Sequence, residues 1–199
     1  MRRAVILTLL ALALPLAAWG SSDIVIDNTG GVLTGSSSGL SLTGSILFNV
    51  GGIVGSNLGT LTFSTGPLIS GDIQHNAVFG GGGSFVITGN GSNGVPNGVI
   101  FSGTFTGNVT WKFTPAGSGG FYTLSGSVSG SGLGGALVGA VIQGTTPVGS
   151  GLFNGTSSIA SGVIDLSPAA TVPEPGTLGL LGTGLLGIAG LVRRKMRSR

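Results

Sequence analysis

The stretch that decides the fold is V99-I-F-S-G-T-F-T-G-N-V-T-W-K-F113. Its odd positions are apolar or glycine, and most of its even positions carry hydroxyl, amide or amine groups. A period of two is typical of a β-strand with one buried face and one solvated face. Because 15 residues exceed a usual strand, we expect Gly103 or Gly107 to mark a bend or a bulge.

The same alternation recurs along the chain. Residues 122–130 repeat it, and residues 40–50 place Leu42, Gly44, Ile46, Phe48 and Val50 on one face. Shorter candidate strands are residues 23–27, 58–63, 73–79, 84–88, 136–142 and 161–166, with glycine-rich turns between them. This spacing predicts an all-β domain, an antiparallel β-sandwich or barrel of about eight to ten short strands. A stacked solenoid is less favoured because the repeat has no fixed period.

The amino-acid composition limits the kinds of functional site that the chain can hold. Glycine supplies 42 of 199 residues, which favours turns over helices. There is no cysteine and one histidine, so disulfides and thiolate metal sites are excluded and a zinc site is not expected. We therefore predict neither a metal nor a cofactor.

The formal charge of +3 belongs to the two ends of the chain. Arg2 and Arg3 lie in the first three residues, and five basic residues lie in the last seven. Between them, Lys112 stands alone against a few aspartates, so the central body is slightly acidic. Nucleic acid is not an expected partner, because phosphate binding needs clustered lysine and arginine.

The first 20 residues have the three parts of a secretory signal: a basic start, an apolar run, and small residues at the end. We predict a signal helix over residues 1–20 that signal peptidase removes. Cleavage after Gly20 would begin the mature protein at Ser21, and cleavage after Ala18 is the alternative. An uncleaved membrane anchor is the other interpretation of this segment.

The last 28 residues, 172–199, have a second three-part pattern. Pro173, Glu174 and Pro175 precede an uncharged run over residues 176–192. As a helix, that run would extend about 25 Å, enough for a thin bilayer, and predicts a transmembrane helix. The basic end, residues 193–199, would stay in the cytoplasm; it holds Arg193, Arg194, Lys195, Arg197 and Arg199. The body, residues 21–171, would then be outside the inner membrane.

This tail resembles the PEP-CTERM sorting domain over residues 173–199. The resemblance implies that an exosortase recognises Pro173, Glu174 and Pro175 and removes the apolar tail. It also implies a source among exopolysaccharide-producing, mostly Gram-negative bacteria, and a final place at the cell surface or in the extracellular matrix. It implies nothing about the body. An ordinary single-span anchor that is never processed is the alternative.

Within the body, residues able to do chemistry are sparse. The leading prediction is a non-enzymatic structural or interaction protein of the cell surface or biofilm matrix. A carbohydrate-binding module is the first alternative, with Trp111 and Tyr122 as glycan contacts and exopolysaccharide as the candidate ligand. A secreted hydrolase using Asp72 and His75 is the second, although no nucleophile motif accompanies that pair.

Overall fold

The computed structural model describes residues 23–117, 119–132, 135–145 and 152–169. The predicted signal helix and the predicted transmembrane helix both lie outside these residues. Among the residues described, no helix is long and apolar enough to cross a membrane.

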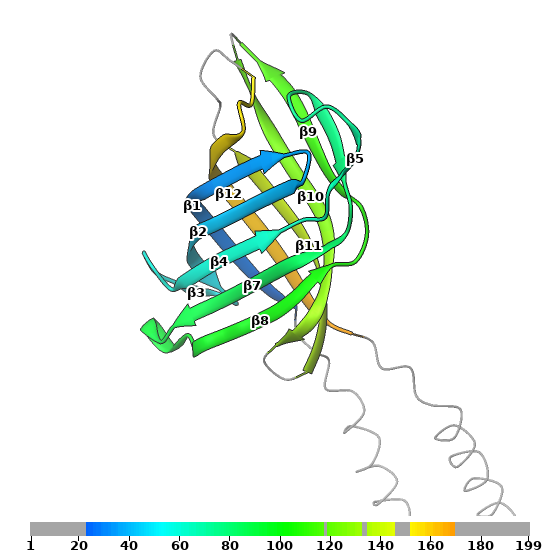
Figure 1. Cartoon of the computed structure of the whole chain (residues 1–199). Helices are drawn as coiled ribbons and strands as arrows, with labels where there is room; N and C mark the ends of the chain where they lie inside the picture. Colours follow the sequence, from blue (N-terminus) through cyan, green and yellow to red (C-terminus); the bar gives the residue numbers. More distant parts are fainter. Residues whose placement is uncertain (1–22, 118, 133–134, 146–151, 170–199) are drawn as a thin grey trace, which may run out of the picture. The chain divides into compact units, whose positions relative to one another are not determined.

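The described residues form one antiparallel sheet of twelve strands that closes on itself (Figure 1). The order β11-β12-β1-β2-β4-β7-β8-β10 returns to β11 and makes an eight-stranded barrel. The elements are β1 Ile24–Ser36, β2 Gly39–Val50, β3 Ile53–Val54, β4 Gly59–Ser64, β5 Leu68–Gly71, β6 Asn76–Phe79, β7 Gly82–Asn90, the 3-10 turn η2 Ser92–Gly94, β8 Asn97–Phe105, β9 Val109–Ala116, β10 Gly119–Gly132, β11 Gly135–Thr145 and β12 Thr156–Pro168. The all-β prediction is confirmed, and backbone pairing around the whole circuit makes the fold a barrel.

Residues 99–113 belong to two strands, β8 and β9, that lie along one edge of β10. The second half of β10 pairs with β8, and its first half pairs with β9. Phe105 pairs with Val128, and Thr110 pairs with Ser125. The segment from Phe105 to Thr110 is longer than the segment of β10 that lies opposite it, so the first segment must bulge or bend. The predicted break is therefore confirmed at Gly107, between β8 and β9. β9 then leads through β6 to β5, which extend the sheet beyond the barrel.

Two bulges correct the predicted faces. In β8 the register shifts between the pairs Ile87–Phe101 and Thr88–Val99. Ile100 is consequently buried, and Val99 is 59% exposed, although the alternation had placed Val99 inside. An extra residue moves every side chain beyond it to the other face of the sheet.

The second bulge lies in β2 at Gly44, whose φ is +69°. It buries Ser45 and Leu47, whereas Ile46 is exposed and Phe48 is half-buried. The predicted inward face was therefore wrong for Ile46 and Phe48. Glycine takes this left-handed conformation without the strain that a side chain would add.

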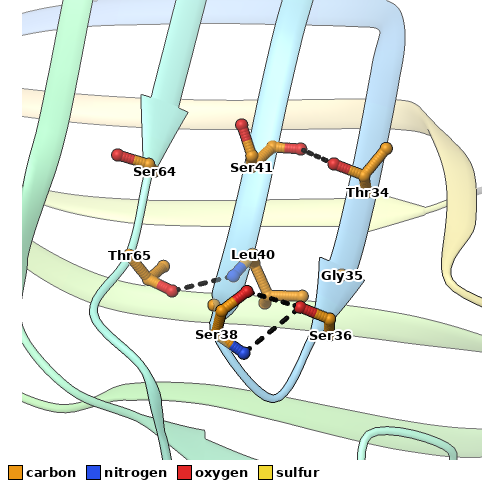
Figure 2. Close-up of a pocket in the computed structure, with 9 residues that line it drawn as sticks. Thr34, Gly35, Ser36, Ser38, Leu40, Ser41, Ser64 and Thr65 are labelled. Atoms are coloured by element: carbon orange, nitrogen blue, oxygen red, sulfur yellow. Dashed lines mark hydrogen bonds between the residues drawn. The ribbon is translucent and has the colours of Figure 1, made fainter.

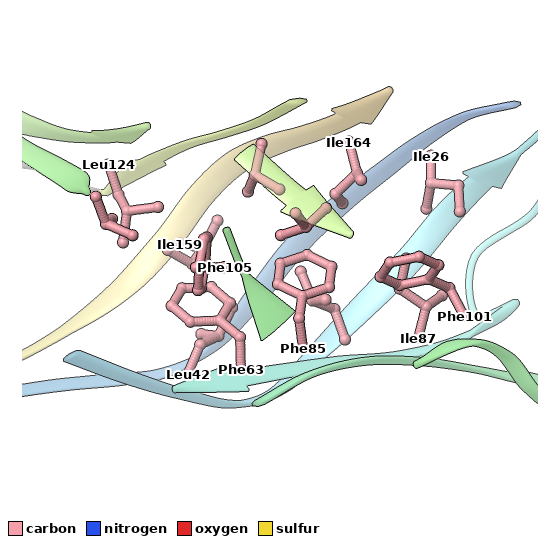
Figure 3. Close-up of a cluster of buried hydrophobic side chains, with 14 of the residues drawn as sticks. Ile26, Leu42, Phe63, Phe85, Ile87, Phe101, Phe105, Leu124, Ile159 and Ile164 are labelled. Atoms are coloured by element: carbon pink, nitrogen blue, oxygen red, sulfur yellow. The ribbon is translucent and has the colours of Figure 1, made fainter. Parts of the chain in front are cut away.

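Aromatic side chains fill one wall of the barrel interior. Phe63 and Phe85 stack at 5.8 Å with a 5° interplanar angle, and Phe105 meets both rings edge-on. Figure 3 shows aliphatic side chains of the opposite wall, including Ile164, turned toward these rings. The rings contribute geometry-dependent stabilisation beyond their burial.

A small polar cluster is buried inside the barrel. Asn28 and Gln143 exchange hydrogen bonds through their amides, at 2.8 and 3.0 Å. Asn28 Nδ2 also donates to Ser45 Oγ at 2.8 Å. Both amides flank Gly162 in the register, and a Cβ on that glycine would collide with their oxygens. The missing side chain at Gly162 therefore permits the amides of β1 and β11 to pair across β12.

We expect Gly162→Ala to lower the free energy of unfolding by about 1–3 kcal/mol, because the added methyl group forces buried amides apart. Denaturant unfolding of the full chain measures the loss. Gly144→Ala is the matched control, since its Cβ would lie 3.4 Å from the Ser161 carbonyl oxygen, an ordinary contact. Equal stability of the two variants would contradict the proposed role of Gly162.

Candidate functional site

Trp111 and Tyr122, the predicted glycan contacts, lie in an aromatic cluster under the β5–β6 turn. Trp111 is 1% exposed and Tyr122 is 0% exposed. Their rings stack at 4.8 Å, and Phe153 packs edge-on against both. Trp111 Nε1 donates to the Ile73 carbonyl oxygen at 2.8 Å.

The Tyr122 hydroxyl joins two chain segments that are distant in sequence. It donates to the Gln74 carbonyl oxygen at 2.6 Å and accepts from the Phe153 backbone N–H at 2.9 Å. The polar ends of both aromatic residues are thus occupied by main-chain groups. The structure corrects the expectation that Trp111 and Tyr122 offer surfaces to a glycan, because inward position and stacking leave no accessible ring face.

We expect Tyr122→Phe to lower the free energy of unfolding by about 1–3 kcal/mol, because it leaves a buried backbone N–H without its acceptor. It should also accelerate proteolysis near residues 72–75, the turn that the hydroxyl holds. Phe121→Leu is the control, since Phe121 is 39% exposed on the other face of β10. Unchanged stability and protease resistance of Tyr122→Phe would show that the hydroxyl does not hold the turn.

Asp72 and His75, the predicted hydrolase pair, come together in the exposed β5–β6 turn. His75 Nδ1 lies 2.8 Å from Asp72 Oδ2, and both side chains are more than half exposed. The Gln74 backbone N–H donates to Asp72 Oδ1 at 2.9 Å. This backbone hydrogen bond, and then the bond with His75, hold the pKa of Asp72 below its ordinary value of 3.8.

This geometry is that of a turn cap. In the part of the chain that the structure describes, no serine or threonine hydroxyl is hydrogen-bonded to the His75 ring. A Ser-His-Asp hydrolase needs that contact to activate its nucleophile. The predicted pair is therefore brought together without the third group.

The remaining carboxylates of the body do not converge on a metal site. Asp23 accepts from Ser167 Oγ at 2.7 Å, and Asp27 accepts from Asn49 Nδ2 at 2.9 Å. The described residues contain no group of three or more histidine and acidic side chains placed to hold a metal ion.

A hydroxyl-lined hollow of about 240 Å³ lies where the β1–β2 hairpin meets the end of β4 (Figure 2). Six of its lining residues carry hydroxyl groups, and none carries a charge. They are Thr34, Ser36, Ser38, Ser41, Ser64 and Thr65. The predictions named no residue of this hollow, because the chain has many serines and threonines and only pairing between strands gathers these six.

Hydrogen bonds hold the walls of the hollow in place. Thr65 is 7% exposed; its Oγ1 accepts from the Leu40 backbone N–H at 3.0 Å and donates to the Gly66 carbonyl oxygen at 2.9 Å. On the hairpin, the hydroxyls of Ser36 and Ser38 lie 2.6 Å apart. The hollow is thus a preformed polar depression on the outside of the barrel.

The predicted sorting residues all lie outside the described residues, and comparison with known families covers most of them. Residues 171–195 match the family described as the PEP-CTERM protein-sorting motif. The match contains Pro173, Glu174 and Pro175, together with Arg193, Arg194 and Lys195 of the basic end. Arg197 and Arg199 fall beyond it. The recognition role of Pro173, Glu174 and Pro175 and the retention role of the basic residues stay predictions.

No curated protein and no solved structure matched this chain. The sorting motif is therefore what connects this chain to known proteins, and it marks an exported protein that is held at the membrane by its tail and then processed by an exosortase.

Proposed function

We propose that the exported barrel is a non-enzymatic structural or interaction protein of the cell surface or biofilm matrix. The observation that carries this proposal is the division of the barrel into a packed and mostly apolar interior, whose buried amides bond one another, and an exterior on which ionisable groups are scattered. Such a body offers a stable surface to partners rather than a reaction centre.

The interior supports this function because aromatic and aliphatic side chains occupy it. Phe63, Phe85 and Phe105 contact one another across the strands that would line a ligand cavity. An eight-stranded barrel is just wide enough for its own side chains to fill. Partners are therefore expected on the outside surface.

The exterior supports a non-enzymatic function because the Asp72–His75 pair, which has catalytic residue types, is exposed to solvent and, among the residues that the structure describes, lacks a nucleophile. Asp72 and His75 are both more than half exposed, and the hydrogen bonds of Asp72 cap its own turn. Catalytic carboxylates and histidines are usually tuned by burial and by a convergent third group. The hydrolase alternative therefore has less support than an interaction role.

Closure of the sheet into a barrel is favourable for a protein that works outside the cell. The eight barrel strands pair with a neighbour on both sides, so they present no long free edge for aggregation. The body also has no cysteine to oxidise. In the proposed sequence of events, signal peptidase cuts near residue 20, the tail holds the protein in the inner membrane, and the exosortase releases the body toward the surface of a Gram-negative cell.

A triple substitution, Pro173→Ala with Glu174→Ala and Pro175→Ala, should block processing while it keeps the apolar run and the basic end. We expect the variant to accumulate at the membrane with its tail attached. A chain lacking residues 173–199 should instead leave the membrane without processing. Fractionation and intact-mass measurement distinguish the three proteins.

Pro67→Ala is the matched control for the sorting test, since Pro67 is an exposed residue of the body. It should be processed like the wild type. If the triple variant had the same mass and distribution as the wild type, the motif would not be the processing signal in this chain.

Complementation of a deletion strain separates an interaction role from catalysis. A chain with Asp72→Asn and His75→Ala should restore biofilm mass and surface coverage to the wild-type level, because neither side chain is expected to do chemistry. Loss of complementation at equal surface abundance would favour the hydrolase. Failure of the wild-type chain to alter either property would contradict the matrix role.

A further inference from the structure

The hollow of Figure 2 belongs to a longer row of hydroxyl side chains that crosses the barrel strands. Thr34 of β1 pairs with Thr156 of β12 on one side and with Ser41 of β2 on the other. Ser41 pairs with Ser64 of β4, and Ser64 pairs with Ser84 of β7. We call these five residues the hydroxyl row. Three of its members, Thr34, Ser41 and Ser64, line the hollow.

The hydroxyl row faces outward on a rigid support. Thr34, Ser64 and Ser84 each lie next to a buried residue of their own strand: Leu33, Phe63 and Phe85 respectively. Side chains alternate between faces, so burial of these neighbours directs the row toward solvent. The stacked rings of Phe63 and Phe85 lie beneath its β4 and β7 members. The supporting strands are therefore held before any ligand arrives.

Strand spacing sets the period of the row. Neighbouring strands lie about 4.8 Å apart, so five strands place a hydroxyl at each step over about 19 Å. That length exceeds one sugar ring and corresponds to several units of a chain. A serine or threonine hydroxyl both donates and accepts hydrogen bonds, as a sugar hydroxyl does. The Ser64 and Ser84 hydroxyls lie 3.1 Å apart and bond each other, and Thr34 Oγ1 donates to the Ser41 carbonyl oxygen at 3.4 Å. The row therefore offers the lone pairs and donors that these bonds leave, at regular intervals, to a polyhydroxylated polymer.

The charge of the barrel favours an uncharged polymer over a polyanion. The hollow has no charged side chain. The described residues hold four aspartates, Asp23, Asp27, Asp72 and Asp165, against the single amine of Lys112. A polyanion would meet net repulsion and find no cationic partner in the hollow. An uncharged chain has no such penalty.

Backbone pairing disfavours an extended peptide as the ligand. The strands that carry the middle of the row, β1, β2 and β4, pair with a strand on both sides. A peptide added to this face would find no free main-chain N–H or C=O groups, which give strand addition its affinity. The groups that a ligand can bind on this face are side-chain hydroxyls.

We propose that the hydroxyl row and its hollow form a binding site for an uncharged polysaccharide chain laid across the strands. This inference rests on the proposed function, since it names the class of partner for the exported barrel. Its site differs from the predicted glycan contacts, because Trp111 and Tyr122 are buried.

The test variant is Thr34→Val with Ser41→Ala, which removes the hydroxyls of two residues paired in register, together with the 3.4 Å hydrogen bond from Thr34 Oγ1 to the Ser41 carbonyl oxygen. The matched control is Thr104→Val with Ser129→Ala, the same two substitutions at a pair on β8 and β10 outside the hollow. Ser64→Ala with Ser84→Ala is the second row variant, for use if the first does not fold. Thermal unfolding checks that each variant is folded.

Binding of the full chain to an immobilised neutral glucan, a neutral mannan and a polyuronate is then measured by interferometry. The detergent must lack a sugar head group, which would compete for the site. High ionic strength screens attraction between the basic tail and the polyuronate. We expect binding to at least one neutral polymer, weakened about tenfold in the row variant by the loss of two hydrogen bonds and unchanged in the control.

Any of three binding results would overturn the inference: no binding to either neutral polymer, equal losses in the row and control variants, or row-dependent binding to the polyuronate alone. A change in sedimentation mass caused by the row variant would also overturn it, by showing that the row joins copies of the chain.

If the wild type binds neither neutral polymer but still complements the deletion strain, this inference fails and the proposed function stands. If it binds but does not complement, the failure lies with the proposed function.

Discussion

The pairing of β10 with β11 is the constraint on which the rest of the structure depends. It runs from the Thr123–Gly144 pair to the Gly132–Gly135 pair and closes the circuit of eight strands. Closure gives every side chain of those strands one of two places, inside or outside. It satisfies the backbone polar groups without helices or disulfides, so burial and pairing together stabilise a chain that has no cysteine.

Glycine lets neighbouring strands of the barrel approach closely. Gly103 and Gly130 face each other between β8 and β10, and a Cβ on either would collide with the backbone of the other strand. Gly162 performs a related role inside the barrel, where the amides of Asn28 and Gln143 pair above it. Part of the high glycine content is therefore a packing requirement, and it need not signal disorder.

The division of side chains between the interior and the outer surface also determines which groups can contact a partner. Most of the large rings are directed inward, and Trp111 and Tyr122 use their polar atoms to hold the β5–β6 turn. The outer surface is left with hydroxyl groups, exposed aliphatic side chains such as those of Val99 and Ile142, and few charges. A sorting tail that delivers such a body outside the inner membrane is consistent with a surface or matrix protein that recognises uncharged partners by hydrogen bonding.

The sequence by itself determined the β class, a strand break at Gly103 or Gly107, and the sorting motif, because each depends on residues close together in the chain. Alternation is a local property, and Pro173, Glu174 and Pro175 are read as one short motif. Only the tertiary structure decided the faces beyond Gly44 and at Val99, because a bulge depends on the partner strand. It likewise decided the burial of Tyr122 and the alignment of the hydroxyl row, since both arise from registers between strands distant in sequence.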